Sequence, residues 1–274
     1  SGVHVHLYDR LCPTPMLSFA VRHLHCSAGI VISASHNTKE YNGIKCYGPD
    51  GGQMTEIPAA KVSAAIETID LFEPEHLRFE EALEKGLVTY IPDSVWQDYY
   101  ARISREAIYP ENVKKAALRV VYSPLCGAGG EPVSEMLTRL GAELHIPESQ
   151  RLPSGEFASC PTPNPETDSA FDENYKLAAQ CRPDIILATD PDSDRIAAAI
   201  PVGGGFRKLS GNEMGCLLLD YVINARRATG TMPENPGAMA SIVSTAMART
   251  ICEKNGVHFE DTFTGFKFMA ELVN

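Results

Sequence analysis

The sequence lacks the features that would assign it to several common classes of protein. No apolar run among its 274 residues approaches the roughly 18 residues that a membrane span needs. Positive charge is scarce, since 24 Lys and Arg stand against 35 Asp and Glu, and the net charge of −11 argues against a nucleic-acid partner. The eight cysteines contain no C-x-x-C pair, so neither a zinc site nor a redox pair is indicated. These absences predict a globular protein with neither nucleic acid nor a membrane as its partner.

The start of the chain and the dispersed cysteines together indicate a cellular compartment. Residues 1–6 have neither the basic head nor the long apolar core of a signal peptide. Several cysteines lie in apolar contexts, as in residues 215–219, where cysteine behaves as a small hydrophobic residue with a free thiol. We therefore expect a cytoplasmic protein.

Short apolar runs alternate with amphipathic segments along the chain, an order typical of α/β proteins whose mixed or parallel sheets are covered by helices. The length suits about two domains and part of a third. Strands are predicted over residues 3–8, 29–33, 41–47, 118–122, 142–146, 184–188, 196–202, 238–243 and 257–260. Helices are predicted over residues 15–25, 57–69, 95–108, 132–140, 169–179, 211–225, 246–255 and 264–274.

Three details refine this organisation. The side chains of Trp96, Tyr100, Ile103 and Ala107 recur at helical spacing and predict a stripe of core residues. Pro110 is interpreted as the start of a linker. Ser210 or Asn212 is expected to cap the helix that follows.

The acidic stretch at residues 188–196, ATDPDSDRI, follows a predicted buried strand. Its carboxylates at Asp190, Asp192 and Asp194 would point the same way in an extended backbone, whose side chains alternate with period two. Their mutual repulsion favours a hard divalent ion with oxygen ligands, and Mg²⁺ is the usual choice where phosphate is present. The alternative is a solvated acidic turn, which Pro191 and Ser193 would suit.

A second polar loop follows another predicted strand. Ser35 lies just past the strand at residues 29–33, where open α/β sheets place ligands. A cap or turn role is the alternative for Ser35 and Asn37. A serine hydrolase is not indicated, because the sequence has no G-x-S-x-G elbow and His36 adjoins Ser35 in the chain.

The small-residue loop at residues 126–130, CGAGG, precedes a predicted helix. Such a loop can hold phosphate on its backbone N–H groups, and it can equally serve a tight turn. It has neither the lysine of a Walker motif nor the glycine spacing of a dinucleotide site.

Three motifs together resemble the α-D-phosphohexomutase superfamily: residues 33–38 (SASHNT), 41–45 (YNGIK) and 190–195 (DPDSDR). The sequence is most similar to the bacterial phosphoglucomutase/phosphomannomutase members of that superfamily. The resemblance implies consecutive mixed α/β/α sandwich domains. It implies an isomerase, an intramolecular phosphotransferase that interconverts sugar 1-phosphates and 6-phosphates through a phosphoserine and a bisphosphate intermediate. The serine loop departs mildly from the usual T-A-S-H-N-P, with Ser33 and Thr38 as the changed positions.

The same resemblance implies roles for individual residues. Ser35 would carry the phosphoryl group, Lys45 would transfer a proton, and His36 and Arg195 would position phosphate or substrate. One Mg²⁺ would be held by Ser35, through its phosphate, and by Asp190, Asp192 and Asp194. Substrate contacts would come from Thr264, Gly265 and Lys267, and a sugar 1,6-bisphosphate would act as activator.

Two of these assignments compete with plainer interpretations. Lys45 is otherwise a surface lysine on a strand, although a lysine beside a cationic site can have a lowered pKa. Lys267 is otherwise a solvated helix lysine.

The resemblance also divides the chain. It implies a phosphoserine-loop domain over residues 1–110, incomplete at its start, a metal-loop domain over 111–208, and the start of a third α/β domain over 209–274. The sugar-binding G-E-x-S-G and the phosphate-binding R-x-S-G-T-E-P of complete members do not occur in the sequence. We therefore expect a fragment that is inactive as a mutase by itself.

Two other classes of function stay open. A non-catalytic phosphosugar-binding module would keep both loops without a phosphate on Ser35. A Mg-dependent aspartyl phosphatase would leave Ser35 idle. The sequence decides neither the sugar nor the oligomeric state.

Overall fold

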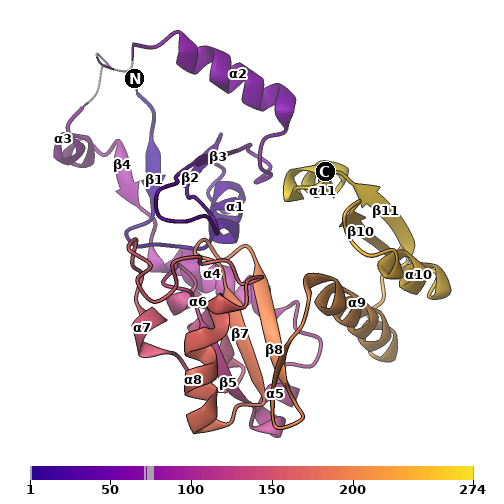
Figure 1. Ribbon diagram of the computed structural model, residues 1–274. Helices are drawn as coiled ribbons and strands as arrows, with labels where there is room; N and C mark the ends of the chain where they lie inside the picture. Colours follow the sequence, from indigo (N-terminus) through magenta and orange to yellow (C-terminus); the bar gives the residue numbers. More distant parts are fainter. Residues whose placement is uncertain (1, 71, 73–76, 274) are drawn as a thin grey trace.

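Short strands alternate with helices throughout the described chain, and they form small sheets with helices packed on them (Figure 1). The computed structural model describes residues 2–70, 72 and 77–273. None of the described helices is long and apolar enough to cross a membrane. The expected mixed α/β architecture is confirmed.

The N-terminal segment, residues 2–104, contains two small sheets. Its elements are β1 (Val5–Leu7), α1 (Thr14–His23), β2 (Gly29–Ile32), β3 (Ile44–Tyr47), α2 (Glu56–Glu67), α3 (Phe79–Glu84), β4 (Val88–Tyr90) and α4 (Asp93–Ser104). Strands β1 and β4 pair in parallel, and β2 pairs antiparallel with β3 so that Val31 faces Lys45. The predicted strands here are present but shorter, and α3 and β4 were not predicted.

The central segment, residues 111–208, forms one five-stranded mixed sheet with the order β6-β5-β7-β8-β9. Its strands are β5 (Arg119–Ser123), β6 (Glu143–His145), β7 (Ile185–Thr189), β8 (Ile196–Val202) and β9 (Gly205–Lys208). Its helices are α5 (Glu111–Ala116), α6 (Gly130–Arg139), α7 (Glu148–Arg151), a 3₁₀ turn (Ser169–Phe171) and α8 (Asp172–Cys181). Strands β5, β6 and β7 are parallel, whereas β8 and β9 return antiparallel. The side chains of Phe171, Ile186 and Ala199 are fully buried in its core.

The C-terminal segment, residues 211–273, lies at the right of Figure 1. It contains α9 (Gly211–Ala228), β10 (Gly237–Ser241), α10 (Met247–Lys254), β11 (His258–Thr262) and α11 (Phe266–Val273), with β10 and β11 parallel. Ser210 caps α9 through a reciprocal capping box with Glu213, whereas the Asn212 side chain accepts a hydrogen bond from the Thr245 N–H. The last residue of the predicted final helix, Asn274, lies outside the described residues.

Two predictions about residues 95–110 were wrong. Helix α5 begins at Glu111, directly after Pro110, so the segment interpreted as a linker is helical; proline is tolerated at a helix start, where a backbone N–H would have no intrahelical partner. Helix α4 ends at Ser104, so Ala107 lies beyond it and is exposed. The stripe is otherwise confirmed, since Trp96 and Tyr100 are buried and Ile103 is half-buried.

Helix α4 joins the N-terminal segment to the central one. Trp96 and Tyr100 of α4 pack in one cluster with Met16 of α1 and Met136 of α6. Arg10 lies 4.0 Å above the Trp96 ring, and its guanidinium pairs with Asp93 at the start of α4 and Glu131 in α6. These contacts set how the loops of the two segments meet.

The small-residue loop after β5 packs directly against the acidic turn between β7 and β8. A Cβ atom on Gly127 would lie 2.3 Å from the Pro191 Cα and 2.5 Å from the Pro191 carbonyl oxygen, both backbone atoms. The next N–H, that of Ala128, donates to the same carbonyl at 2.7 Å. Glycine is therefore required at position 127 by the close approach of another backbone.

We predict that Gly127→Ala lowers the free energy of unfolding by about 1–3 kcal/mol, because the backbone of Pro191 has to move to admit the methyl group. Urea denaturation followed by circular dichroism measures the change. Gly215→Ala is the control, since a Cβ there meets no atom within 4 Å. Equal stability of the Gly127 variant and the wild type would contradict the packing described.

Candidate active site

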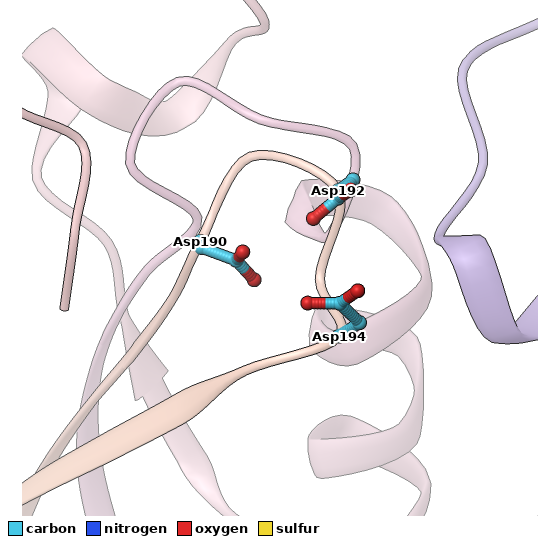
Figure 2. Close-up of side chains that lie close together, drawn as sticks. All are labelled: Asp190, Asp192 and Asp194. Atoms are coloured by element: carbon cyan, nitrogen blue, oxygen red, sulfur yellow. The ribbon is translucent and has the colours of Figure 1, made fainter. Parts of the chain in front are cut away.

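Three carboxylates converge in the turn between β7 and β8. One oxygen from each of Asp190, Asp192 and Asp194 lies within 4.8 Å of the others, and Figure 2 shows the three groups facing a shared space inside the turn. Asp190 and Asp192 are buried, whereas Asp194 is exposed. Burying two like charges this close is unfavourable unless cations offset them.

The backbone that produces this convergence is a turn, so the prediction of an extended stretch was wrong. The Ser193 N–H donates to the Asp190 carbonyl at 2.9 Å, and Ser193 has a left-handed φ of 58°. The Asp190 N–H in turn donates to the Arg195 carbonyl at 3.4 Å. The turn directs the three side chains inward. The alternation of side chains along an extended strand would not bring them together in this way.

The Ser35 loop meets the acidic turn from the N-terminal segment. The Ser35 hydroxyl donates to Oδ2 of Asp190 at 3.1 Å. Ser35 has a left-handed φ of 53°, a conformation that costs on the order of 1–3 kcal/mol for a residue with a Cβ. The surrounding contacts hold it there, and such strain is common at functional sites.

Lys45 supplies a cation to the acidic turn. Its Nζ lies 2.9 Å from Oδ2 of Asp192 and 3.0 Å from Oδ2 of Asp194. Partial burial by itself would lower the pKa of Lys45, but the hydrogen bonds and charges of the two aspartates outweigh it and raise the pKa. The lowering expected beside a bound cation stays a prediction, because the charges next to Lys45 here are those of the two carboxylates.

The pKa values of the two buried aspartates are shifted in opposite directions. Burial first, and then the charges of Asp192 and Asp194, raise the pKa of Asp190 to about 7. Burial would also raise the pKa of Asp192, but hydrogen bonds from Lys45 and Ser33 outweigh it and lower the pKa. Asp190 is consequently the carboxyl group that retains a proton near neutral pH.

His36 contacts the serine, and Arg195 contacts the aspartate that accepts its hydrogen bond. The His36 Nδ1 lies 3.3 Å from the Ser35 hydroxyl oxygen, and burial, followed by the positive charge of Arg195, lowers the pKa of the imidazole. The Arg195 backbone N–H donates to Oδ1 of Asp190 at 2.9 Å. Its guanidinium is exposed and makes no hydrogen bond or ion pair within the described part of the chain.

The oxygen donors of the turn fit a divalent cation. Oδ1 of Asp192 is buried and has no hydrogen-bond partner among the described residues, which is unfavourable unless a ligand satisfies it. Three carboxylates without nitrogen or sulfur donors match hard ions such as Mg²⁺. Asp190, Asp192 and Asp194 are therefore the residues that can hold a metal.

Asp192 also makes contacts that the sequence analysis missed. The Ser33 hydroxyl donates to Oδ2 of Asp192 at 2.8 Å, and the Thr14 N–H donates to its carbonyl at 2.9 Å. Ser33 belongs to the motif quoted for the serine loop, but a serine at a strand end carries no signal of its distant partner. Thr14 starts helix α1, and its first N–H groups have no intrahelical acceptors.

A cavity of about 410 Å³ borders the site. Its wall includes Ser33, Ser35 and Asp192. The loops around Lys39 and Glu156 face each other across it and are joined by an ion pair of 2.8 Å. The space is adequate for a small polar ligand next to the serine.

The predicted substrate contacts in the C-terminal segment are not joined to this site. Thr264, Gly265 and Lys267 precede or begin α11, and no hydrogen bond or ion pair connects their described side chains to the aspartates or to Ser35. The Lys267 Nζ lies 4.9 Å from the ring centre of Phe268. Their role stays a prediction.

Comparison with known proteins agrees with this geometry. Residues 1–73 match the family description "Phosphoglucomutase/phosphomannomutase, alpha/beta/alpha domain I", and residues 97–203 match domain II of the same family. A phosphoglucomutase of Staphylococcus aureus strain USA300 is 35% identical over 276 residues, and one of Staphylococcus epidermidis ATCC 12228 is 34% identical over 272. The alignments cover 99% and 98% of this chain and 48% of each relative, so the chain spans about half the length of these curated relatives.

Solved structures share the fold. A phosphoglucomutase/phosphomannomutase family protein of Burkholderia thailandensis superposes with a TM-score of 0.67 at 20% identity, over 96% of this chain and 52% of that one. An N-acetylglucosamine-phosphate mutase of the alpha-D-phosphohexomutase superfamily gives a TM-score of 0.50 at 14% identity, over 98% of this chain and 66% of that one. With both domain matches in chain order and relatives at 35% identity, the chain belongs to the phosphoglucomutase/phosphomannomutase family.

Proposed function

We propose that the protein to which this chain belongs is a phosphohexomutase that uses Ser35 as its phosphoryl carrier. The observation that carries the proposal is the 3.1 Å contact between the Ser35 hydroxyl and Asp190 inside a three-carboxylate site. A hydroxyl nucleophile beside a divalent-ion site is the arrangement that phosphoryl transfer needs, because positioning and charge neutralisation supply most of the catalysis.

In this proposal each residue of the site has one role. Asp190, Asp192 and Asp194 would hold one Mg²⁺, which supplies positive charge to a phosphoryl group carried on Ser35. His36 and Arg195 would orient that group. Lys45, 2.9 Å from Asp192, would move a proton to or from the reacting sugar hydroxyl.

The transfer itself balances within the site. As Ser35 gives its phosphoryl group to a sugar hydroxyl, the bond from the serine oxygen to phosphorus breaks and a bond from the sugar oxygen to phosphorus forms. In the same step the sugar hydroxyl loses its proton, and the Ser35 oxygen takes one up as its bond to phosphorus breaks. The reverse step from the other end of the bisphosphate restores phospho-Ser35, so the net change is migration of phosphate between C1 and C6.

The substrate class, the domain division and the cellular location are part of the same proposal. The substrate would be a sugar phosphate, with a sugar 1,6-bisphosphate as activator and with Thr264, Gly265 and Lys267 as later contacts. The division at residues 110 and 208 would separate the serine-loop, metal-loop and third domains. A cytoplasmic location is supported by the eight free cysteines.

Ser35→Ala should abolish uptake of phosphate by the chain and, in the longer protein, lower mutase turnover by several orders of magnitude, because it removes the covalent carrier. Purified protein is incubated with Mg²⁺ and glucose 1,6-bisphosphate, and intact-mass and peptide mass spectrometry locate any added phosphate. Ser154→Ala, which alters another serine of the same cavity, should leave uptake unchanged.

The same experiment separates the alternatives. Phosphate on an aspartate of the acidic turn would favour a phosphatase. Tight binding of the bisphosphate without any covalent phosphate would favour a non-catalytic module. Either result contradicts the role proposed for Ser35.

Affinity for Mg²⁺ should fall about tenfold from pH 8 to pH 6. Metal binds the deprotonated carboxylates, and below its pKa of about 7 Asp190 has to release a proton first, whereas above that pH no proton is displaced. Isothermal titration calorimetry in two buffers of different ionisation enthalpy measures both the affinity and the proton release.

His36→Asn is the control for this pH dependence, because the imidazole next to Ser35 is also ionisable. The tenfold change should persist in that variant. Its disappearance, or metal binding without proton release at pH 6, would contradict the assignment to Asp190.

A further inference from the structure

Ser33 occupies a position between the two loops of the proposed site. Its hydroxyl oxygen lies 2.8 Å from the backbone nitrogen of Ser35 and 2.8 Å from Oδ2 of Asp192. The two partners are 157 positions apart in the chain, yet a single side chain contacts both.

The direction of these two hydrogen bonds is determined by their chemistry. A backbone N–H can only donate, so the Ser33 oxygen accepts from Ser35. A hydroxyl has one proton, and the remaining partner, Oδ2 of the Asp192 carboxylate, accepts it. The polar chain therefore runs from the Ser35 amide through the Ser33 hydroxyl to Asp192.

Ser33 is itself held rigidly enough to orient both partners. Its N–H donates to the Gly43 carbonyl at 3.0 Å, which extends the pairing of β2 with β3 by one position. On one side its hydroxyl fixes the amide of Ser35, the residue with the left-handed φ of 53°. On the other side it fixes one oxygen of Asp192.

The choice of oxygen on Asp192 matters for a metal. Oδ2 is occupied by Ser33 and by Lys45, whereas Oδ1 is buried with no partner among the described residues. Rotation of the carboxylate about its last bond would exchange the two oxygens. Two donors on Oδ2 oppose that rotation and leave Oδ1 available as a ligand.

We propose that Ser33 is a positioning residue that couples metal binding at Asp192 to the backbone conformation of Ser35. The inference rests on the proposed function, because it takes the acidic turn as a metal site and Ser35 as the phosphoryl carrier. Ser33 touches neither metal nor phosphate in this role, and it acts through the two residues that do.

Three substitutions of Ser33 separate the hydroxyl from the shape of the side chain. Ser33→Thr retains the hydroxyl, Ser33→Val has the same shape as threonine without it, and Ser33→Ala removes it with the least steric change. Ser63→Ala, on the exposed helix α2, is the control. Mn²⁺ affinity is measured by electron paramagnetic resonance, and the exchange rate of the Ser35 amide hydrogen by NMR on the metal-free chain.

Loss of a group that orients a metal ligand typically weakens binding by about 10–100-fold. We expect that loss in Ser33→Ala and Ser33→Val, with affinity in Ser33→Thr and Ser63→Ala within about threefold of the wild type. The Ser35 amide should exchange at least about tenfold faster in the two variants without the hydroxyl, because its acceptor is gone. Alanine and valine variants with wild-type affinity and wild-type amide exchange would overturn the proposal.

The readouts also distinguish this proposal from the proposed function. If the wild type binds Mn²⁺ and takes up no phosphate from glucose 1,6-bisphosphate, the phosphoryl role of Ser35 is wrong while the affinities of the Ser33 variants still decide the positioning role. If the wild type binds no Mn²⁺, the metal site and the coupling are both overturned. If Ser33→Ala does not fold, the threonine and valine pair decides the question, since the two differ only in the hydroxyl.

Discussion

The repulsion among Asp190, Asp192 and Asp194 is the constraint on which the rest of the site depends. Three carboxylates with oxygens within 4.8 Å of one another, two of them buried, cannot all be ionised without compensating charge. The chain offers partial compensation through Lys45 and through the proton retained on Asp190. A divalent ion bound here would supply the compensating positive charge that Lys45 and the proton on Asp190 now supply in part. Binding of the metal would therefore compete with the proton and with the lysine.

Asp192 is the point at which two segments of the chain meet. Three contacts to it come from helix α1, from the residue that follows strand β2, and from strand β3, through Thr14, Ser33 and Lys45. The aspartate itself belongs to the turn of the central sheet. Its geometry therefore depends on how α4 and Arg10 dock the N-terminal segment on the central one.

Close backbone packing gives the acidic turn its shape. Gly127 admits the backbone of Pro191, and Gly129 leaves room for the side chains of Tyr122, Thr189 and Ser193. The small-residue loop at residues 126–130 therefore packs against the acidic turn and supports it. The left-handed conformations of Ser35 and Ser193 add local strain that the surrounding hydrogen bonds offset.

The sequence by itself determined the order of the elements and the chemical identity of the site. Apolar periodicity located most helices and strands within a few residues, since burial of one face dictates that pattern. The acidic stretch made the three aspartates candidates for a divalent ion, because hard ions take oxygen ligands, and the resemblance of its loop made Ser35 the candidate phosphoryl carrier.

Only the tertiary structure decided how those residues act on one another. The convergence of the aspartates depends on a turn with a left-handed Ser193, which period-two reasoning could not reveal. The raised pKa of Lys45 depends on carboxylates about 150 residues away, and inspection of its own strand could not reveal these partners. The role proposed for Ser33 likewise depends on Asp192, which lies in another segment of the chain. A local sequence pattern shows which face of an element is buried, whereas long-range polar contacts depend on how the segments dock.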